Sequence, residues 1–179
     1  MPHLNPRRAA GLTLVAAATA LTACGVTKSP DEANPRTVAT VRVQSAAGGT
    51  PQPNPQSPVQ GTFTFSELRG IVSVTGTVTG LKPNAAHAFH VHEKGDCTAP
   101  DFSSAGGHFN PTKQPHGAHG SGLHHLGDMP QLMADATGTA KVSFNSQTLT
   151  LRGPNTIIGK AVIVHRRPDD VNHQPVGNA

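Results

Sequence analysis

The sequence contains no tryptophan and no tyrosine, and phenylalanine is its only aromatic residue, with six copies in 179 residues. Side chains on which nucleic-acid bases stack are therefore scarce, and no run of lysine or arginine accompanies the formal net charge of +4. Proteins that bind nucleic acid usually combine a basic patch with such stacking residues. The composition therefore argues against a nucleic-acid partner.

Long apolar stretches are equally scarce. The only one covers residues 9–23, directly after Arg7 and Arg8. This run is too short to span a bilayer comfortably, and a positive start followed by a short apolar run is typical of an export signal. Residues 1–23 are therefore predicted to be a signal peptide. Their removal leaves 156 residues with a charge of about +2, which is enough chain for one domain.

No helical periodicity extends beyond about two turns anywhere in the chain. Short alternating stretches separated by glycine and proline predict a series of strands instead. They lie at residues 37–43, 60–68, 70–79, 85–93, 131–134, 139–145 and 157–165, with 131–134 and 139–145 expected to pair around a turn. The pattern indicates an all-β antiparallel sandwich or flattened barrel.

Side-chain alternation assigns a core face to these strands. Phe63 and Phe65 share one face of their strand, and Val72, Val74 and Val78 share one face of the next. A proline-rich stretch at residues 44–60 separates the first two strands and predicts a surface loop.

Histidine is concentrated from residue 90 onward. In the stretch F-H-V-H, apolar side chains alternate with His90 and His92, which predicts a strand with both imidazoles on one face and Phe89 and Val91 facing the core. Two imidazoles at this spacing can converge on one metal ion. The alternative is a pair of solvated histidines on a half-buried strand.

The stretch that follows is rich in glycine, proline and histidine and predicts a long loop. It offers three imidazoles and one carboxylate, the donor set of a closed zinc site, from His108, His116, His125 and Asp128. Zinc would tie down a loop that is otherwise costly to order. The loop also contains His119 and His124, which spacing alone does not separate from the other histidines, and which are interpreted as solvated loop residues.

Five motifs resemble those of the copper–zinc superoxide dismutases. They are F-H-V-H-E-K-G-D-C, S-A-G-G-H-F-N-P, P-H-G, H-L-G-D-M-P and V-I-V-H-R-R-P-D-D, and the likeness covers residues 37–179. The intervals between the histidines, Asp128 and Asp169 also agree with those of the family. The resemblance implies an immunoglobulin-like, Greek-key antiparallel β-barrel over residues 37–179, with long metal-binding loops.

The same resemblance implies one copper and one zinc ion for each chain. The implied copper ligands are His90, His92, His108 and His165. The implied zinc ligands are His108, His116, His125 and Asp128. His108 would bridge the two metals and act in catalysis. Asp169 would accept hydrogen bonds from His90 and His116 and so orient one ligand of each metal.

The implied activity is dismutation of superoxide to oxygen and hydrogen peroxide, which would protect the cell envelope. Zinc has no redox chemistry, whereas copper changes oxidation state, so copper would exchange electrons with superoxide. His108 would take up a proton and deliver it to the product. Two alternatives are a weakly active or inactive copper/zinc-binding envelope lipoprotein and a purely structural β-domain.

The sequence departs from the family at its end, G-N-A, at residues 177–179. The family continues there with a glycine-rich segment, an arginine beside the copper, a cysteine and a final strand. We therefore expect the final strand and the guiding arginine to be missing, and Cys97 to be an unpaired thiol. A truncated copy of a longer protein and a natural short form are the two explanations.

The stretch L-T-A-C, which ends at Cys24, resembles a bacterial lipobox. It implies lipid on Cys24 and an exported protein anchored to the extracytoplasmic face of the cell envelope, whereas an ordinary signal peptide is the alternative. Residues 24–36 are polar and unpatterned and are predicted to be a tether between the lipid and the domain. A homodimer is left open, because dimers of the family pair through different surfaces.

Overall fold

The computed structural model describes residues 27–29, 37–45 and 58–172. Within these residues the chain forms nine strands and one short 3₁₀ helix. They are β1 (Thr27–Ser29), β2 (Thr37–Gln44), β3 (Gln60–Leu68), β4 (Ile71–Thr79), β5 (Ala86–His87), β6 (Phe89–Val91), η1 (Ser103–Ala105), β7 (Leu132–Met133), β8 (Ala140–Ser146) and β9 (Val162–Val164). The described part contains no helix with the length and hydrophobicity of a membrane span.

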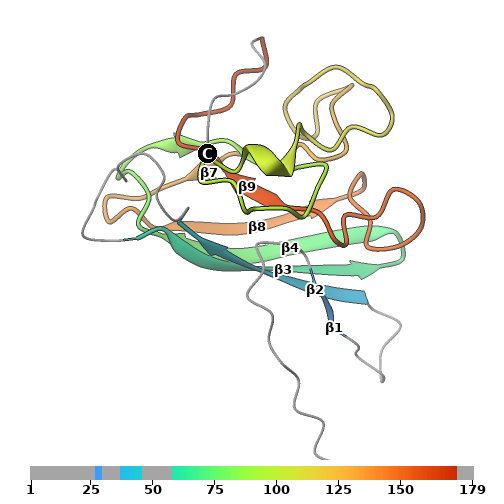
Figure 1. Cartoon of the computed structure of the whole chain (residues 1–179), viewed down its shortest axis with the longest axis horizontal. Coiled ribbons are helices and arrows are strands. Elements are labelled where there is room, and N and C mark those ends of the chain that lie inside the picture. Colours follow the sequence, from blue (N-terminus) through green and yellow to red (C-terminus); the bar gives the residue numbers. More distant parts are fainter. Residues whose placement is uncertain (1–26, 30–36, 46–57, 173–179) are drawn as a thin grey trace, which may run out of the picture.

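Five antiparallel strands form the main sheet, in the order β1-β2-β3-β4-β8. Two short antiparallel pairs, β5 with β7 and β6 with β9, complete the strand pairing. Figure 1 shows β7 and β9 over one face of the main sheet, with the long loops on their outer side. The predicted all-β, antiparallel fold class is confirmed.

Burial alternates along the central strands as their sequences predict. Phe63 and Phe65 of β3 and Val72, Val74 and Val78 of β4 are fully buried on the inner face of the main sheet. Burying one such side chain contributes roughly 1.5–3 kcal/mol. The main sheet is therefore the stable base on which the short strands rest.

An aromatic pair joins this base to the strand that carries the first two histidines. The ring centroids of Phe63 on β3 and Phe89 on β6 are 4.6 Å apart. Phe89 and Val91 are both buried in the main core. Because neighbouring strand residues point to opposite faces, packing these two side chains inward directs His90 to the other face of β6.

The strand predicted at residues 85–93 is divided into β5 and β6 at Ala88. The N–H of Ala88 donates to the main-chain oxygen of Arg167 (2.8 Å), and its carbonyl accepts from the N–H of His165 (2.8 Å). Before Ala88 the chain pairs with β7, and after it the chain pairs with β9. The prediction of one continuous strand is wrong because the chain changes partner at this residue.

Two other strand predictions also need correction. The stretches 131–134 and 139–145 do not pair with each other, because β7 pairs with β5 and β8 pairs with β4. A turn separates them, in which the Asp135 carboxylate accepts from the N–H groups of Thr137 (2.8 Å) and Thr139 (3.0 Å). The last predicted strand is shortened to β9, because residues 157–160 form a turn closed by the Lys160 N–H.

Residues 27–29, predicted to lie in an unpatterned tether, form β1 instead. They pair antiparallel with β2, with Thr27 opposite Thr40. The exposed edge of a sheet offers unpaired backbone groups, which a short polar segment can satisfy without any hydrophobic pattern. The predicted signal peptide, the rest of the tether and residues 46–57 of the proline-rich loop lie outside the described residues.

A buried carboxylate ties the loop after β8 to the main sheet. Glu67, at the end of β3, is 7% exposed. Its Oε2 atom accepts a hydrogen bond from the N–H of Leu151 (2.6 Å) and lies 3.4 Å from the hydroxyl of Thr150. Residues 148–153 therefore form a loop that is held by a side chain from the core face of β3.

Replacing this acceptor should destabilise the protein. Glu67→Ala is expected to lower the free energy of unfolding by about 1–3 kcal/mol, because the buried Leu151 N–H loses its partner. Glu67→Gln keeps an acceptor oxygen and is expected to lose less. Urea denaturation of both variants measures the difference, and equal losses would contradict the assigned role of the hydrogen bond.

Candidate metal centre

Strand pairing brings the predicted ligands of three separate segments together. His90 lies on β6, His92 follows it, and His165 follows β9, which is the partner of β6. Two isolated bridges then attach the long loop to this pair, His90 with Asp128 and His92 with His108. The loop is thus held by backbone pairing along the edge of β6 that faces away from β9.

The first group consists of the four residues for which the sequence predicts copper binding. One ligand atom from each residue lies within 4.8 Å of the others in the group His90, His92, His108 and His165. The Nε2 atoms of His92 and His165 are 3.3 Å apart. The rings of His90 and His108 are 4.0 Å apart between centroids. Four imidazoles thus face one small, enclosed region.

The second group is arranged around Asp128. Its Oδ1 atom lies 3.4 Å from His108 Nδ1 and 3.3 Å from His125 Nδ1, and its Oδ2 atom lies 3.1 Å from His116 Nδ1. These are the four residues predicted for zinc. By mutual distance, His90 also groups with His108, His116 and Asp128. His108 contacts members of both groups, because its ring lies against His90 and His92 while its Nδ1 atom faces Asp128, and this is the position expected of a bridging residue.

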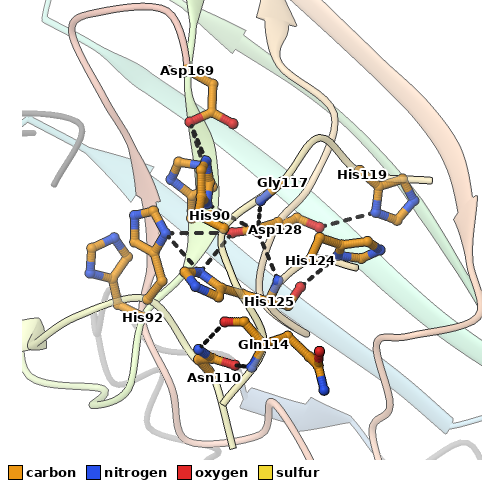
Figure 2. Close-up of polar contacts among 12 residues, drawn as sticks. His90, His92, Asn110, Gln114, Gly117, His119, His124, His125, Asp128 and Asp169 are labelled. Carbon is orange, nitrogen blue, oxygen red and sulfur yellow. Dashed lines mark hydrogen bonds and ion pairs between the residues drawn. The ribbon is translucent and has the colours of Figure 1, made fainter. Parts of the chain in front are cut away.

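Asp169 lies against both groups through one oxygen atom. Its Oδ1 is 3.3 Å from His90 Nε2 and 3.0 Å from His116 Nε2. Figure 2 shows this carboxylate above His90. Because Nε2 of each ring faces Asp169, Nδ1 of each ring is left for the centre of its group.

Several buried polar atoms in the cluster lack a hydrogen-bond partner among the described residues. They include His90 Nδ1, His116 Nδ1 and Asp128 Oδ1. A buried polar atom without a partner costs about 1–3 kcal/mol, so several in one place need a compensating interaction. Imidazole nitrogen and carboxylate oxygen are ligands of copper and zinc, and bound ions would satisfy these atoms. The residues present therefore fit metal binding.

Three of the imidazoles, those of His90, His92 and His125, are held in the neutral form that binds metal. The pKa of His92 is lowered to about 4, chiefly by burial and to a lesser extent by the charges of His108 and His90, whereas the hydrogen bond to the Gly106 oxygen acts to raise it. Burial also lowers the pKa of His90 and of His125. At neutral pH these rings are neutral, so a metal ion does not have to displace a proton from them.

The carboxylates are held in the opposite, charged form. Burial alone would raise the pKa of Asp128, but the close contact with His108 and the charges of His116 and His125 outweigh it and lower the pKa to about 2. For Asp169 too, burial is outweighed, here chiefly by the contact with His90, and the pKa is lowered. Both carboxylates are therefore ionised at neutral pH.

The loop and the last histidine are held by residues that the sequence analysis did not single out. Asn110 and Gln114 exchange two hydrogen bonds, from Asn110 Nδ2 to the Gln114 oxygen (2.8 Å) and from the Gln114 N–H to Asn110 Oδ1 (3.0 Å). Buried His87 lies with Nδ1 2.9 Å from the main-chain oxygen of His165. The only sequence signal for these residues is their proximity to predicted ligands.

The interpretation of His119 and His124 as solvated residues is wrong for His124, which is 8% exposed. His119 is half-buried. Nδ1 of His119 lies 3.0 Å from the main-chain oxygen of Asp128, and Nδ1 of His124 lies 2.7 Å from that of His125. Both rings therefore support the backbone of predicted zinc ligands. The sequence does not show this, because burial here depends on the path of the loop.

The prediction that Cys97 is an unpaired thiol is also wrong. Cys97 is disulfide-bonded and packs against a small apolar cluster formed by Ala105, Ala161 and Ile163. The prediction relied on the lack of a later cysteine and on lipid at Cys24. Cys24 is the only other cysteine of the sequence and lies outside the described residues.

Known proteins are similar to this chain in sequence and in fold. The family model described as copper/zinc superoxide dismutase (SODC) matches residues 59–179. A protein of Paramecium bursaria Chlorella virus 1 named superoxide dismutase (Cu-Zn) is 44% identical over 116 residues, which cover 65% of this chain and 62% of the viral protein. The chain therefore spans less than two thirds of the length of that relative.

Two further proteins are similar. A Brassica juncea protein named superoxide dismutase (Cu-Zn) 2 is 44% identical over 117 residues, which cover 65% of this chain and 76% of that protein. Among solved structures, the crystal structure of the clock protein EA4 aligns with a TM-score of 0.63 at 34% identity and covers 75% of this chain and 77% of that one.

The metal-free protein is expected to lose stability as the pH falls from 6.5 toward 4. Unfolded His92 titrates at its ordinary pKa of 6.5, whereas in the fold its pKa is about 4, so the unfolded chain binds the proton first. This difference in the pKa of His92 contributes about 3 kcal/mol to the free energy of unfolding at neutral pH. Asp128, whose pKa is lowered from 3.8 to about 2, acts in the same direction at lower pH.

Urea denaturation of the chelator-treated protein at about pH 7 and about pH 4.5 measures this loss. His92→Gln removes the titrating ring. The free energy of unfolding of this variant should therefore fall by about 2–3 kcal/mol less than that of the wild type between the two pH values. An unchanged pH dependence in this variant would contradict the assignment.

Proposed function

The chain belongs to the copper/zinc superoxide dismutase family, and on that basis we propose that it converts superoxide to oxygen and hydrogen peroxide at the two histidine groups. In this reaction two superoxide anions and two protons give one oxygen molecule and one hydrogen peroxide molecule. One observation supports the proposal best: the ligand atoms of four imidazoles lie close together, directly beside a second group that contains a carboxylate. His108 belongs to both of these groups. A copper site joined to a zinc site needs both groups and a residue shared between them.

Copper and zinc are the cofactors of this family, and we assign one to each group. Copper supplies one-electron redox chemistry when bound, whereas zinc supplies none and stabilises the loop. The all-nitrogen group suits copper, and its ligands are His90, His92, His108 and His165. The group with an oxygen donor suits zinc, and its ligands are His108, His116, His125 and Asp128.

Contacts with neighbouring oxygen atoms determine which nitrogen of His92 and of His90 is available to copper. His92 Nδ1 donates to the main-chain oxygen of Gly106 (2.8 Å), so its Nε2 carries the lone pair that faces His165. His90 turns Nε2 toward Asp169, so Nδ1 is its free nitrogen. Such contacts fix the tautomer and the ring orientation, so each imidazole is ready to bind metal without rearranging.

His108 is the residue best placed to move a proton. Its Nδ1 lies 3.4 Å from Asp128 Oδ1, which leaves Nε2 for the side of His92 and His165. A ring held by one nitrogen can take up a proton at the other and donate it to the reduced oxygen species. Its side chain is 6% exposed, so the proton and a small anion reach it from solvent while bulk water is largely excluded.

The dismutation rate of the full chain loaded with copper and zinc tests this proposal. Pulse radiolysis in the presence of EDTA, which suppresses catalysis by loose copper, should give a rate at least about 100-fold above that of His165→Ala. Met133→Ala alters an exposed side chain on β7 and should leave the rate unchanged. Equal rates in the wild type and His165→Ala, with both metals retained in the wild type, would instead support the alternative of a weakly active metal-binding lipoprotein.

We propose further that the protein is exported, is anchored to the cell envelope by lipid on Cys24 and protects that compartment from superoxide. The positive start, the apolar run over residues 9–23 and the motif L-T-A-C support export and lipid attachment. The disulfide at Cys97 also indicates an oxidising compartment. Together with lipid on Cys24, this disulfide requires a cysteine of another chain as its partner, because the sequence contains two cysteines.

The intact mass of the protein isolated from producing cells tests the anchor. After reduction, the expected mass is that of residues 24–179 with lipid attached. Lipid on Cys24 and a disulfide between Cys24 and Cys97 exclude each other, because both need the same sulfur atom and the chain has two cysteines. A chain without lipid whose mass increases on reduction would contradict the anchor.

A further inference from the structure

His119 and His124 lie in the loop between β6 and β7, and the proposed function uses neither of them. We propose that these two histidines form a further metal site for a divalent transition-metal ion such as Cu²⁺. The site goes beyond the proposed function, since both residues are outside the copper and zinc groups. Figure 2 shows the two rings next to each other, on the side of Asp128 away from His92.

A tight turn returns the loop so that the two rings meet. The Ser121 N–H donates to the Ala118 oxygen (3.0 Å), and Gly120 and Gly122 have positive φ angles of 79° and 39°. Such angles suit glycine, which has no side chain to clash. The resulting centroid separation of the His119 and His124 rings is 5.5 Å, at an interplanar angle of 53°.

This separation matches that of imidazole pairs within the copper and zinc groups. The rings of His92 and His165 are 5.4 Å apart, and their Nε2 atoms are 3.3 Å apart. The rings of His108 and His125 are also 5.4 Å apart, and their Nδ1 atoms are 3.4 Å apart. Two imidazoles at about this separation can therefore direct nitrogen atoms at one ion.

Hydrogen bonds leave the same nitrogen available on both rings. Each Nδ1 faces a main-chain carbonyl, that of Asp128 for His119 (3.0 Å) and that of His125 for His124 (2.7 Å). A carbonyl only accepts, so each Nδ1 carries the proton and each Nε2 carries a lone pair. His92 is arranged in the same way, with its Nδ1 bonded to the Gly106 oxygen and its Nε2 in the copper group.

The two Nε2 atoms are also open to an incoming ion. The described part of the chain provides no hydrogen bond to either atom, and neither is among its buried unpaired atoms, so both contact solvent. The His119 ring rests edge-on against Phe144 of β8, with centroids 5.3 Å apart, and His124 is nearly buried. Rings that are already ordered lose little entropy on binding.

The donor set defines the class of ion. Two imidazoles without a carboxylate favour Cu²⁺, Ni²⁺ or Zn²⁺ over Mg²⁺ or Ca²⁺, which prefer oxygen ligands. Cu²⁺ binds such nitrogen ligands most tightly in the divalent series. Water would complete the coordination, so the ion should exchange more readily than an ion held by four protein ligands.

Titration of the full chain with Cu²⁺, after its copper and zinc groups have been filled, tests this site. Calorimetry is expected to show about one further equivalent bound by the wild type and none by the double variant His119→Asn, His124→Asn. Asparagine retains an N–H near the position of Nδ1 and has no counterpart of Nε2, so it preserves the bonds to the Asp128 and His125 carbonyls. Each single variant should bind at least about tenfold more weakly.

Leu123→Ala serves as the matched control, because Leu123 is 66% exposed and adjoins His124 but offers no ligand. It should bind the further ion as the wild type does. A further equivalent that persists in the double variant, or is absent from the wild type, would overturn the proposal. Bound metal is counted here, so the result does not depend on dismutase activity.

A second measurement uses the unchanged protein and does not depend on how the variants fold. Substoichiometric Cu²⁺, added after the first two groups are filled, should broaden the ring proton NMR signals of His119 and His124 before those of any other histidine. Broadening that begins at another histidine would reject the site.

Discussion

The structure depends on the burial of one charged group, the carboxylate of Asp128, whose side chain is 1% exposed. An ionised carboxylate inside a protein is costly unless hydrogen bonds and opposite charge surround it. Its Oδ2 accepts from the N–H groups of His125 (2.9 Å) and Gly117 (3.3 Å), and three imidazoles contact it. All of these groups belong to the same long loop, so the path of the loop is set by the need to enclose this carboxylate.

The β6 strand connects that loop to the fold. Its inner face packs Phe89 against Phe63 of the main sheet, and its outer face presents His90. Asp128 pairs with the same residue through the backbone bridge to His90. One face of this short strand therefore packs in the core, and the other face positions a predicted metal ligand. A substitution that shifts the core-facing side chain also shifts the ligand, because both belong to the same strand.

The sequence predicted those parts of the structure that depend on local alternation. Phe63, Phe65 and Val72 were placed correctly, because a strand with one buried face repeats every two residues whatever its partners are. The division at Ala88 and the pairing of β5 with β7 were not predicted, because they depend on which distant strand lies alongside. The β1 strand was missed because pairing at a sheet edge needs no apolar pattern.

The candidate site divides in the same way. Ligand identity follows from residue type and spacing, so the histidines that meet around His108 were named from the sequence together with the family resemblance. Burial and hydrogen bonding inside a loop follow from its three-dimensional path, which spacing does not encode. For this reason the positions of His124 and Asn110 and the disulfide of Cys97 emerged only from the structure.

One oxygen atom, Asp169 Oδ1, contacts imidazoles of both groups, His90 on one side and His116 on the other. A displacement of this carboxylate that shortens its contact with one imidazole also changes its contact with the other imidazole. A metal ion bound at one group would therefore alter how firmly the ring in the other group is held. The two binding equilibria are then linked, and linkage is reciprocal: zinc changes the affinity for copper by the same factor by which copper changes the affinity for zinc. Binding of copper and zinc at the two groups would therefore be coupled through this shared hydrogen-bond acceptor.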